Sequence, residues 1–521
     1  GEKKMAEVNL IGGGSTGGTV TTGGTGLPPS NCRNLEMKKE GTQVSLKWTD
    51  PQDTVIDGQY LCSWGGTMIV RKAGSYPASS TDGTLIKDSK VRNAYFAEAL
   101  VDNLPDNENE YFYRAFPYSV NGAVNLDTHN VFGAVVYGFY IDTLDPNPAT
   151  RVHYIEDNEY FKPAKMNFST GLFDFGDWAD AWFIRNLRPC MLKNDGTVDY
   201  ELYEYNYALK KDGEPSDIAN TSYNGNAMVG IPQVWLKYVK VGTRFYVYIA
   251  NKQVDSAFKA YAHINNNGDL LDEIFLPIYE GSLISGKLRS LSGQRPESST
   301  TSEAERNAAV ANGDGWFTGV LADWLLIQML TVLIGRTTDS QSTFGNGHYS
   351  GGTQASHLHT TGALNTKGLF WGSSGNDGIK MFGQENATGD RWERIAGWIN
   401  VSGTQKIKLT YGTEDGSTAT GYNETGSGYI AIGAAPSGTS GGYISKAALT
   451  QWGIFPCEAS GSSSTFYCDG LWFNNGQTDY ALVGGSCTDV MRVGVFCSYL
   501  NVLPSHSTWN FGASLSCKPL L

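Results

Sequence analysis

Charged residues are scarce in this chain, and long apolar runs are missing from it. Only 17% of the 521 residues are charged, and acidic residues outnumber basic ones by 52 to 39, which gives a net charge of −13. Nucleic acids and anionic membranes attract basic faces, and this balance does not favour one. No run reaches the ~20 apolar residues of a membrane-spanning helix. We therefore expect no nucleic-acid binding and no membrane insertion.

Cysteines are few, and their spacing matches no common metal or redox motif. The chain has eight Cys and no Cys-x-x-Cys pair, which argues against a zinc ribbon and a thioredoxin-type site. A chain of this length can bury its cores without disulfides.

Glycine and aromatic residues are abundant instead. The chain has 63 Gly, and Phe, Trp and Tyr make up 12% of it, a composition typical of turn-rich β proteins. We expect a mainly β chain with α+β character, in three parts. These are a Gly-rich attachment segment or linker over 1–30, a β-sandwich over 31–125 and a large α+β domain over 126–521.

Residues 31–125 show short strands punctuated by Gly and Pro. Strands are expected at Val44–Trp48, at Thr67–Lys72, more weakly at Ala94–Ala97, and on the long aromatic stretch that ends at Tyr118. This pattern resembles a fibronectin type III domain. The resemblance implies a buried Trp48 and a Tyr111 hydroxyl that bonds back to the chain, with Asn121-Gly122 turning the last hairpin. Such modules are usually spacers, so we expect no active site here.

The sequence of residues 126–330 predicts denser packing than in the sandwich before it. Strands are expected at 132–141, 234–239 and 244–249, and a short helix at 177–186. Apolar residues surround most of a helix predicted at 319–335, which is therefore expected to be buried. Residues 340–521 are rich in Gly, Ser and Thr with scattered Trp, which favours long ordered loops over regular elements.

Several segments of this region occur in an order that resembles a known family. They are Gly225–Pro232, Leu288–Gly293, Gln328–Gly347, Gly389–Glu393 and Val483–Ser516. Over about 130–521 the chain resembles the C-type-lectin-like proteins of tailed phages and prophages, many of which are targets of diversity-generating retroelements. The scaffold also resembles that of formylglycine-generating enzymes.

The resemblance implies a receptor-binding protein at the tip of a phage tail, which binds a protein or glycan receptor on the host cell. It implies a virion protein. Because metal, nucleophile and Arg-rich patterns are missing from the sequence, we expect no catalytic residues, cofactor or metal. Its N-terminal segment would bind other tail or baseplate proteins, and the chain would form a homo-oligomer, with a trimer favoured. One alternative is a bacterial surface adhesin of the same fold. Another is an oxidase of the formylglycine-generating type or a tail-borne glycan hydrolase.

The resemblance also implies hypervariable receptor-binding positions within 485–509. Gly484, Gly485, Gly494 and Gly512 are expected to permit tight turns, and Trp509 to fill core. The residues between them are chemically mixed and follow no period of two or 3.6, as a displayed surface permits. The alternative is a twisted strand and loop with ordinary side chains. The candidate contact residues are Cys487, Thr488, Asp489, Met491, Arg492, Val493, Val495, Phe496, Cys497 and Tyr499.

Other chemical patterns are weaker. Cys487 and Cys497 could serve an oxidase as soft-metal ligands, but no Arg-rich substrate pattern surrounds them. His357-Leu-His359, with His348 upstream, resembles the His-x-His iron site of some trimeric phage fibres, and we interpret it as a solvated loop. His263–Asp269 lacks the first Asp of a calcium loop and is expected to be a hairpin turn. The pairs Glu201/Glu204 and Asp272/Glu273 are interpreted as surface charges rather than a glycosidase dyad.

Overall fold

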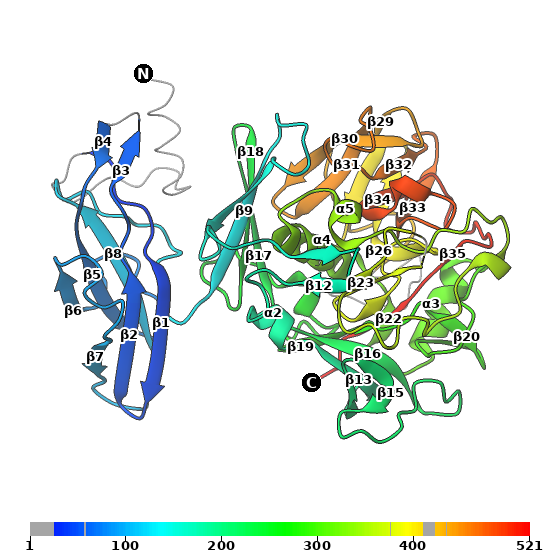
Figure 1. Cartoon of the computed structure of the whole chain (residues 1–521), viewed down its shortest axis with the longest axis horizontal. Helices are drawn as coiled ribbons and strands as arrows, with labels where there is room; N and C mark the ends of the chain where they lie inside the picture. Colours follow the sequence, from blue (N-terminus) through cyan, green and yellow to red (C-terminus); the bar gives the residue numbers. More distant parts are fainter. Residues whose placement is uncertain (1–25, 57–58, 376, 410–421, 434) are drawn as a thin grey trace. The chain divides into compact units, whose positions relative to one another are not determined.

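The computed structural model describes residues 26–56, 59–375, 377–409, 422–433 and 435–521 (Figure 1). The chain is mainly β, as the composition predicted. It divides into two compact units. Unit 1 comprises Gly1–Gly138, Ile155–Glu159 and Tyr248–Lys259, and unit 2 comprises Phe139–Tyr154, Tyr160–Val247 and Ala260–Leu521. The first 25 residues of the expected attachment segment lie outside the described residues.

Unit 1 is a sandwich of two small antiparallel sheets. One has the strand order β1-β2-β7 and the other β6-β5-β8, and β3 and β4 form a separate hairpin. Side chains from both sheets meet in one core, among them Leu46, Ile69 and Tyr113. The strands are β1 (Arg33–Glu40), β2 (Gln43–Thr49), β3 (Thr54–Ile56), β4 (Gln59–Cys62), β5 (Trp64–Ala73), β6 (Thr84–Ser89), β7 (Leu100–Asn103) and β8 (Tyr111–Ser119).

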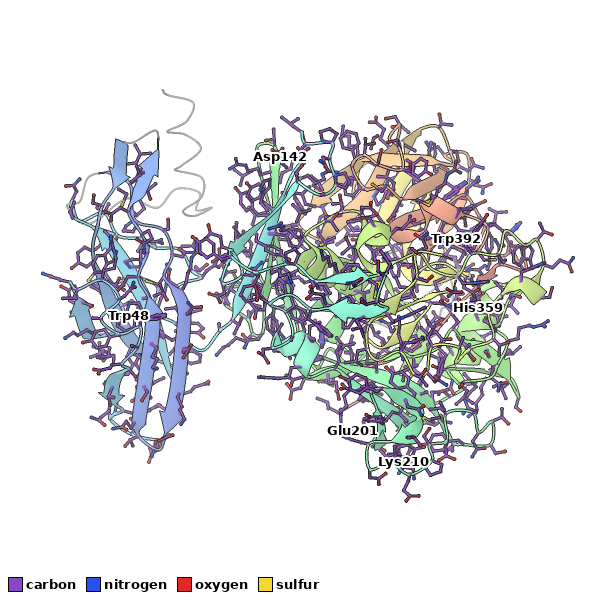
Figure 2. All side chains as sticks on the ribbon, in the orientation of Figure 1. Trp48, Asp142, Glu201, Lys210, His359 and Trp392 are labelled. Atoms are coloured by element: carbon purple, nitrogen blue, oxygen red, sulfur yellow. The ribbon has the colours of Figure 1, made fainter. Side chains whose placement is uncertain are left out.

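Trp48 lies in the middle of this core (Figure 2). Its side chain is 1% exposed, which confirms the predicted burial. The indole stacks on Tyr95 with 4.8 Å between ring centroids and meets the edge of Phe132 at 5.9 Å. Its Nε1–H donates to Asp50 Oδ1 at 2.8 Å, so the polar atom of the buried indole is satisfied.

The prediction of a weak strand at Ala94–Ala97 is wrong. Residues 91–98 form turns and bends, and the strand lies further on, at β7. Asn93 fixes this turn, because its side-chain Oδ1 accepts from the Asp50 N–H at 2.8 Å and its own N–H donates to Asp50 Oδ2 at 2.7 Å. These tertiary hydrogen bonds override the β propensity of Tyr95 and Phe96.

The hydroxyl of Tyr111 does bond back to the chain, although the acceptor is a side chain. It donates to Asp106 Oδ2 at 2.7 Å, and the neighbouring Tyr113 hydroxyl donates to Asp102 Oδ2 at 2.6 Å. After β8 the chain turns at 120–121, where the Gly122 N–H donates to the Ser119 carbonyl at 2.8 Å. The predicted hairpin turn is therefore present.

A four-stranded sheet has the order β10-β9-β18-β17. Three strands were predicted here, and the structure has all three, the first starting four residues later than expected. The chain passes between the two units within β9 and β18 and near the end of β10. The bounds are β9 (Val136–Asp142), β10 (Val152–Glu156), β17 (Trp235–Val241) and β18 (Arg244–Ala250).

Unit 2 contains two large sheets and several small ones. The seven-stranded sheet has the order β15-β14-β13-β16-β19-β36-β22, so the C-terminal strand lies inside it. Its strands are β13 (Arg188–Lys193), β14 (Val198–Tyr203), β15 (Asn206–Lys210), β16 (Gly225–Pro232), β19 (Glu273–Pro277), β22 (Trp316–Thr318) and β36 (Leu515–Cys517). The small sheets use β11 (Lys165–Asn167), β12 (Leu172–Asp174), β20 (Ser282–Ile284), β21 (Lys287–Arg289), β23 (Trp371–Gly372), β24 (Ile379–Met381) and β25 (Gln384–Glu385).

The second large sheet occupies the region for which loops were expected, so that expectation is wrong. Its order is β28-β27-β26-β33-β34-β32-β30-β31-β29, with β35 paired to β26. A glycine here can also mark an irregularity within a strand. Gly397 lies inside β26 at φ +93, where the pairing with β33 shifts register. The strands are β26 (Trp392–Val401), β27 (Thr404–Ile407), β28 (Ile430–Ala431), β29 (Ser437–Gly438), β30 (Gly442–Thr450), β31 (Gly453–Ala459), β32 (Gly470–Phe473), β33 (Thr478–Gly484), β34 (Gly494–Leu500) and β35 (Phe511–Gly512).

The predicted apolar helix is confirmed as α4, and all fifteen of its residues are buried. It contacts β26 and β34 of the ten-stranded sheet. Its polar residues have partners, since Gln328 Nε2 donates to the Val495 carbonyl at 2.9 Å and Asp323 pairs with Lys518 at 3.1 Å. No helix in the described ranges is long and apolar enough to cross a membrane. The helices are α2 (Trp182–Arg185), shorter than predicted, α3 (Ser302–Val310), α4 (Leu321–Gly335) and α5 (Ser340–Phe344), with 3₁₀ turns η1 (Tyr261–His263), η2 (Ala355–His357) and η3 (Val490–Arg492).

Candidate functional site

Half of the expected receptor-contact residues lie in the interior. The buried five are each at most 3% exposed, so the expectation that they contact a receptor is wrong. They are Cys487, Val493, Val495, Phe496 and Cys497. The last three belong to β34, which pairs with β33 on one side and β32 on the other. A strand covered on both faces shows no alternation, and this explains the irregular pattern that favoured a displayed surface.

The other five reach the surface. Thr488 and Met491 are exposed, Met491 by 48%, while Asp489, Arg492 and Tyr499 are half-buried. All but Tyr499 lie on the turn between β33 and β34, which includes η3. Gly484 and Gly485 begin this turn with φ of +85 and +87, as expected, and Gly494 ends it at +151. Trp509 is half-buried rather than a core residue.

Four side chains from separate elements form one cluster, which we call the aromatic face: Tyr443 of β30, Trp472 of β32, Arg492 of η3 and Tyr499 of β34. Trp472 and Tyr499 stack with centroids 5.7 Å apart and planes 21° apart. The Arg492 guanidinium lies 5.3 Å from the Tyr443 ring and 5.7 Å from the Trp472 ring. These distances are within the range of cation–π attraction.

The aromatic face packs on a buried tryptophan. Trp392 is buried beneath it and meets Trp472 at 5.4 Å and Tyr499 at 5.2 Å, edge to face in both cases. All four members of the aromatic face are half-buried. Their positions are therefore fixed by packing while part of each side chain stays accessible to a partner. Trp, Tyr and Arg are the residue types that contribute most to binding hot spots.

A hollow of about 200 Å³ lies beside Met491. Most of its lining residues are polar in type, but most of the surface that faces the hollow is apolar, with the exposed side chains of Met491 and Phe168 among its lining. Gln341 Nε2 donates to the Met491 carbonyl at 2.9 Å, which ties η3 to α5. The lining residues are Phe168, Asp339, Gln341, Ser342, Asn346, Ser374, Ser463, Cys468 and Met491.

A second cavity, of about 80 Å³, lies against the start of α4. Asp323 and Trp324 of the helix line it together with Glu280, Glu385 and Glu393. Ligand pockets usually measure roughly 300–1,000 Å³, whereas this volume suits a few water molecules. The geometry of unit 2 therefore favours recognition on the surface over enclosure of a ligand at this cavity.

The turn before η3 holds its shape through Asp489. The Asp489 carboxylate accepts from the Ser486 N–H at 2.8 Å and from the Ser486 hydroxyl at 2.7 Å. Burial raises the pKa of Asp489 above its ordinary value. The next residue, Val490, adopts φ +51, a conformation that β-branched residues rarely take. The turn thus presents Met491 and Arg492 from a strained backbone.

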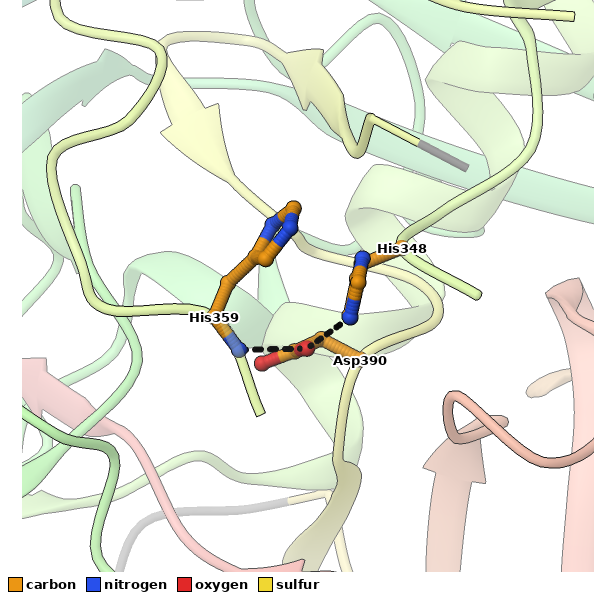
Figure 3. A group of neighbouring side chains, drawn as sticks. All are labelled: His348, His359 and Asp390. Atoms are coloured by element: carbon orange, nitrogen blue, oxygen red, sulfur yellow. Dashed lines mark hydrogen bonds and ion pairs between the residues drawn. The ribbon is translucent and has the colours of Figure 1, made fainter. Parts of the chain in front are cut away.

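His348, His359 and Asp390 lie together, with all three ligand atoms within 4.8 Å of one another (Figure 3). His357 is exposed and stays outside the group, so the two histidines of the His-x-His motif do not act as a pair. Asp390 is 31 residues beyond His359 in the sequence, and no sequence signal links them. Asp390 contacts the base of the turn, because the Cys487 N–H donates to the Asp390 carbonyl at 2.7 Å.

All eight cysteines are free and buried. Burial raises the pKa of Cys487 to about 11 and that of Cys497 well above its ordinary value. Both thiols are therefore protonated at neutral pH, whereas reactive cysteines have lowered pKa values and some exposure. This environment does not favour the oxidase alternative.

The remaining sequence patterns behave as ordinary structure. His263–Asp269 is the expected hairpin turn, with Ile264 bridged to Leu270 and the Asn265 N–H donating to the Asp269 carbonyl at 3.1 Å. Glu201 forms an ion pair with Lys211, and Glu273 forms one with Arg188. Figure 2 marks Glu201 on the outer strands of the seven-stranded sheet.

Comparison of the chain with models of known protein families and with curated proteins gave no match.

Proposed function

We propose that this chain is a receptor-binding protein of a phage tail tip and that the aromatic face, with Met491 beside it, contacts the host receptor. One observation carries the proposal. Tyr443, Trp472, Arg492 and Tyr499 come from four elements and converge, half-exposed, over a buried Trp392. A cluster that is already ordered loses little side-chain entropy on binding.

The same proposal assigns a fold family to each unit. Unit 1 is a fibronectin type III-like spacer, supported by its two three-stranded sheets around a buried Trp48. Unit 2 is a C-type-lectin-like domain that presents residues 488–492 on a turn between two central strands. This turn is where the resemblance implies diversification, and its outward position supports that role.

Binding without catalysis is part of the proposal. Its support is the protonated state of Cys487 and Cys497, the small volume of the cavity at α4 and the ion pairs of Glu201 and Glu273. Weak contacts would suffice, because several chains on one particle gain about 10²–10⁴ in avidity.

The test is cell binding by the purified chain across a panel of bacterial strains. We expect binding to a subset of strains, and Tyr443→Ala and Arg492→Ala should each weaken it about tenfold or more. Tyr205→Ala is the matched control, because Tyr205 is a 59% exposed tyrosine on another part of unit 2. Folding of each variant is checked by its melting temperature.

A double variant Tyr443→Ala/Arg492→Ala that stays folded and binds the same strains as strongly as the original chain would disprove the role of the aromatic face. An equal loss of cell binding in the Tyr205→Ala control would show that the weaker binding is not specific to the aromatic face.

A further inference from the structure

The group formed by His348, His359 and Asp390 has the chemistry of a metal site. Two imidazoles and one carboxylate supply nitrogen and oxygen ligands of the kind that zinc and similar transition metals prefer. His348 and His359 belong to the segment after α5, and Asp390 lies two residues before β26. Figure 3 shows the His348 ring and the His359 backbone N–H directed at the Asp390 carboxylate.

The distance between His348 and Asp390 suits two ligands of one ion better than a hydrogen bond between the side chains. His348 Nε2 lies 3.7 Å from Asp390 Oδ1, beyond hydrogen-bond range. Two ligands about 2.1 Å from a tetrahedral metal are separated by roughly 3.4 Å. The two imidazole rings stack at 3.4 Å between centroids, and His359, being half-buried, has room to turn its ring toward an ion.

Two atoms of the group are buried without a hydrogen-bond partner among the described residues: His359 Nδ1 and Asp390 Oδ2. Asp390 is 0% exposed, and its other oxygen accepts from the His359 N–H at 3.0 Å. Leaving a buried carboxylate oxygen and an imidazole nitrogen unsatisfied is costly. A cation between them would satisfy both.

The surrounding charges also favour a cation. Arg391 is shared by three glutamates, with N–O distances of 3.9 Å to Glu280, 3.8 Å to Glu297 and 2.7 Å to Glu393. This leaves acidic charge in excess around Asp390. A proton shared between Glu280 and Asp390 is the competing way to balance the charge, because the two carboxyl groups lie within hydrogen-bond reach of each other.

We propose that His348, His359 and Asp390 bind one divalent transition-metal ion of the zinc class. Calcium and magnesium prefer sites made of oxygen atoms, and a soft ion such as Cu(I) prefers sulfur. In the bound form His348 presents the Nε2 lone pair to the ion and carries its proton on Nδ1. Its present hydrogen bond from Nε2 to the His357 carbonyl, 2.9 Å long, is then given up.

The ion would fasten the segment after α5 to the base of the η3 turn. The Cys487 N–H already donates to the Asp390 carbonyl at 2.7 Å, and the Cys487 carbonyl accepts from the Ser350 N–H at 3.2 Å and the Gly351 N–H at 3.1 Å. Metal bonds at Asp390 would strengthen these hydrogen bonds of Cys487. Cys487 directly precedes Thr488, which is exposed on the turn. The site would therefore act as a structural clamp below the aromatic face.

The experiment is zinc titration of the chelator-treated full chain by calorimetry, together with melting temperatures. We expect one Zn²⁺ per chain with Kd below about 10 μM and a higher melting temperature with zinc. His348→Ala and His359→Ala should weaken binding at least about tenfold. His357→Ala is the matched control from the same segment and should bind normally. Co²⁺ should give the visible absorption of a tetrahedral site in the original chain and in His357→Ala only.

Equal zinc affinity in the His348→Ala, His359→Ala and original chains would overturn the proposal, as would an original chain that binds no zinc at this level. Loss of zinc binding in His357→Ala alone would also overturn the proposal, because it would place the metal on the exposed loop instead. If an alanine variant fails to fold, the variants His359→Gln and Asp390→Asn are titrated in its place, because they change the size of the side chain less. The titration uses the metal alone, so its outcome is independent of any receptor.

Discussion

Trp472 and Tyr499 lie opposite each other on the parallel strands β32 and β34, and their rings stack 5.7 Å apart. The two residues are 27 positions apart in sequence, and the sheet sets their register. Arg492 reaches the Trp472 ring from the turn that leads into β34. Three of the four members of the aromatic face therefore belong to the sheet and Arg492 to the short turn beside it, which favours a binding surface of fixed shape.

Truncation of the side chain should lower stability strongly at Phe496 and hardly at all at Met491. Phe496 is 0% exposed and packs on Tyr467 at 4.8 Å, so Phe496→Ala should lower the free energy of unfolding by about 3–5 kcal/mol. Met491→Ala should change it by less than about 0.5 kcal/mol, because the side chain is half exposed. Urea denaturation of both variants measures the difference. Similar losses would show that Met491 is a core residue.

Relief of the strained backbone at Val490 should stabilise the chain. A non-glycine residue in the left-handed region costs roughly 1–2 kcal/mol, and Asn tolerates it better than Val. Val490→Asn should therefore raise the free energy of unfolding by up to about 1 kcal/mol. Gly485→Ala provides the opposite control, since φ is +87 and a Cβ would lie 2.6 Å from Val493 Cγ1. A melting temperature lowered by Val490→Asn would contradict the assigned strain.

His263 should make the folded state sensitive to acid. Burial lowers the pKa of His263 from 6.5 to about 4, so the folded chain binds fewer protons than the unfolded chain between these values. Its contribution to stability is full above pH 6.5 and is lost as the pH falls toward 4, by about 3 kcal/mol. His263→Gln should remove this part of the pH dependence.

The measurement for His263 is the difference in unfolding free energy between the original chain and His263→Gln, followed from pH 7 to pH 4. Taking the difference cancels other titrating groups, such as Asp479, whose pKa burial raises to about 6. A difference that stays constant over this range would contradict the assignment.

Removal of residues 1–25 should separate attachment from recognition. The deletion ends before Pro29, because the Pro29 carbonyl accepts from Asn125 Nδ2 at 2.8 Å within unit 1. We expect receptor binding per chain to be unchanged and incorporation into phage particles to be lost. The readouts are cell binding by the purified chain and its content in virions. Normal incorporation of the shortened chain would refute the attachment role.

Local patterns predicted elements whose environment is simple. The apolar circumference of α4 indicated full burial, and the alternation in β2 indicated a strand with Trp48 inside. The same reasoning failed for β34, because a strand covered on both faces and a displayed segment both lack alternation.

The candidate site depends on pairings that no local pattern contains. Tyr443 joins Arg492 only because β30 and β32 pair, and Asp390 meets His359 only through the path of the chain before β26. Arg492 and Tyr499 were found because they fall inside the segment where the resemblance implies variable positions. Tyr443 lies in none of the segments that carry the resemblance, and Asp390 lies in one of them, Gly389–Glu393, without a role being predicted for it.

The burial of all eight native cysteines makes the chain suitable for site-selective labelling. A maleimide dye applied to the folded protein would find no exposed native thiol, so a cysteine introduced at the exposed Thr488 would be the preferred attachment point. Fluorescence from that position would report directly on events at the neighbouring aromatic face, in single particles as well as in purified protein.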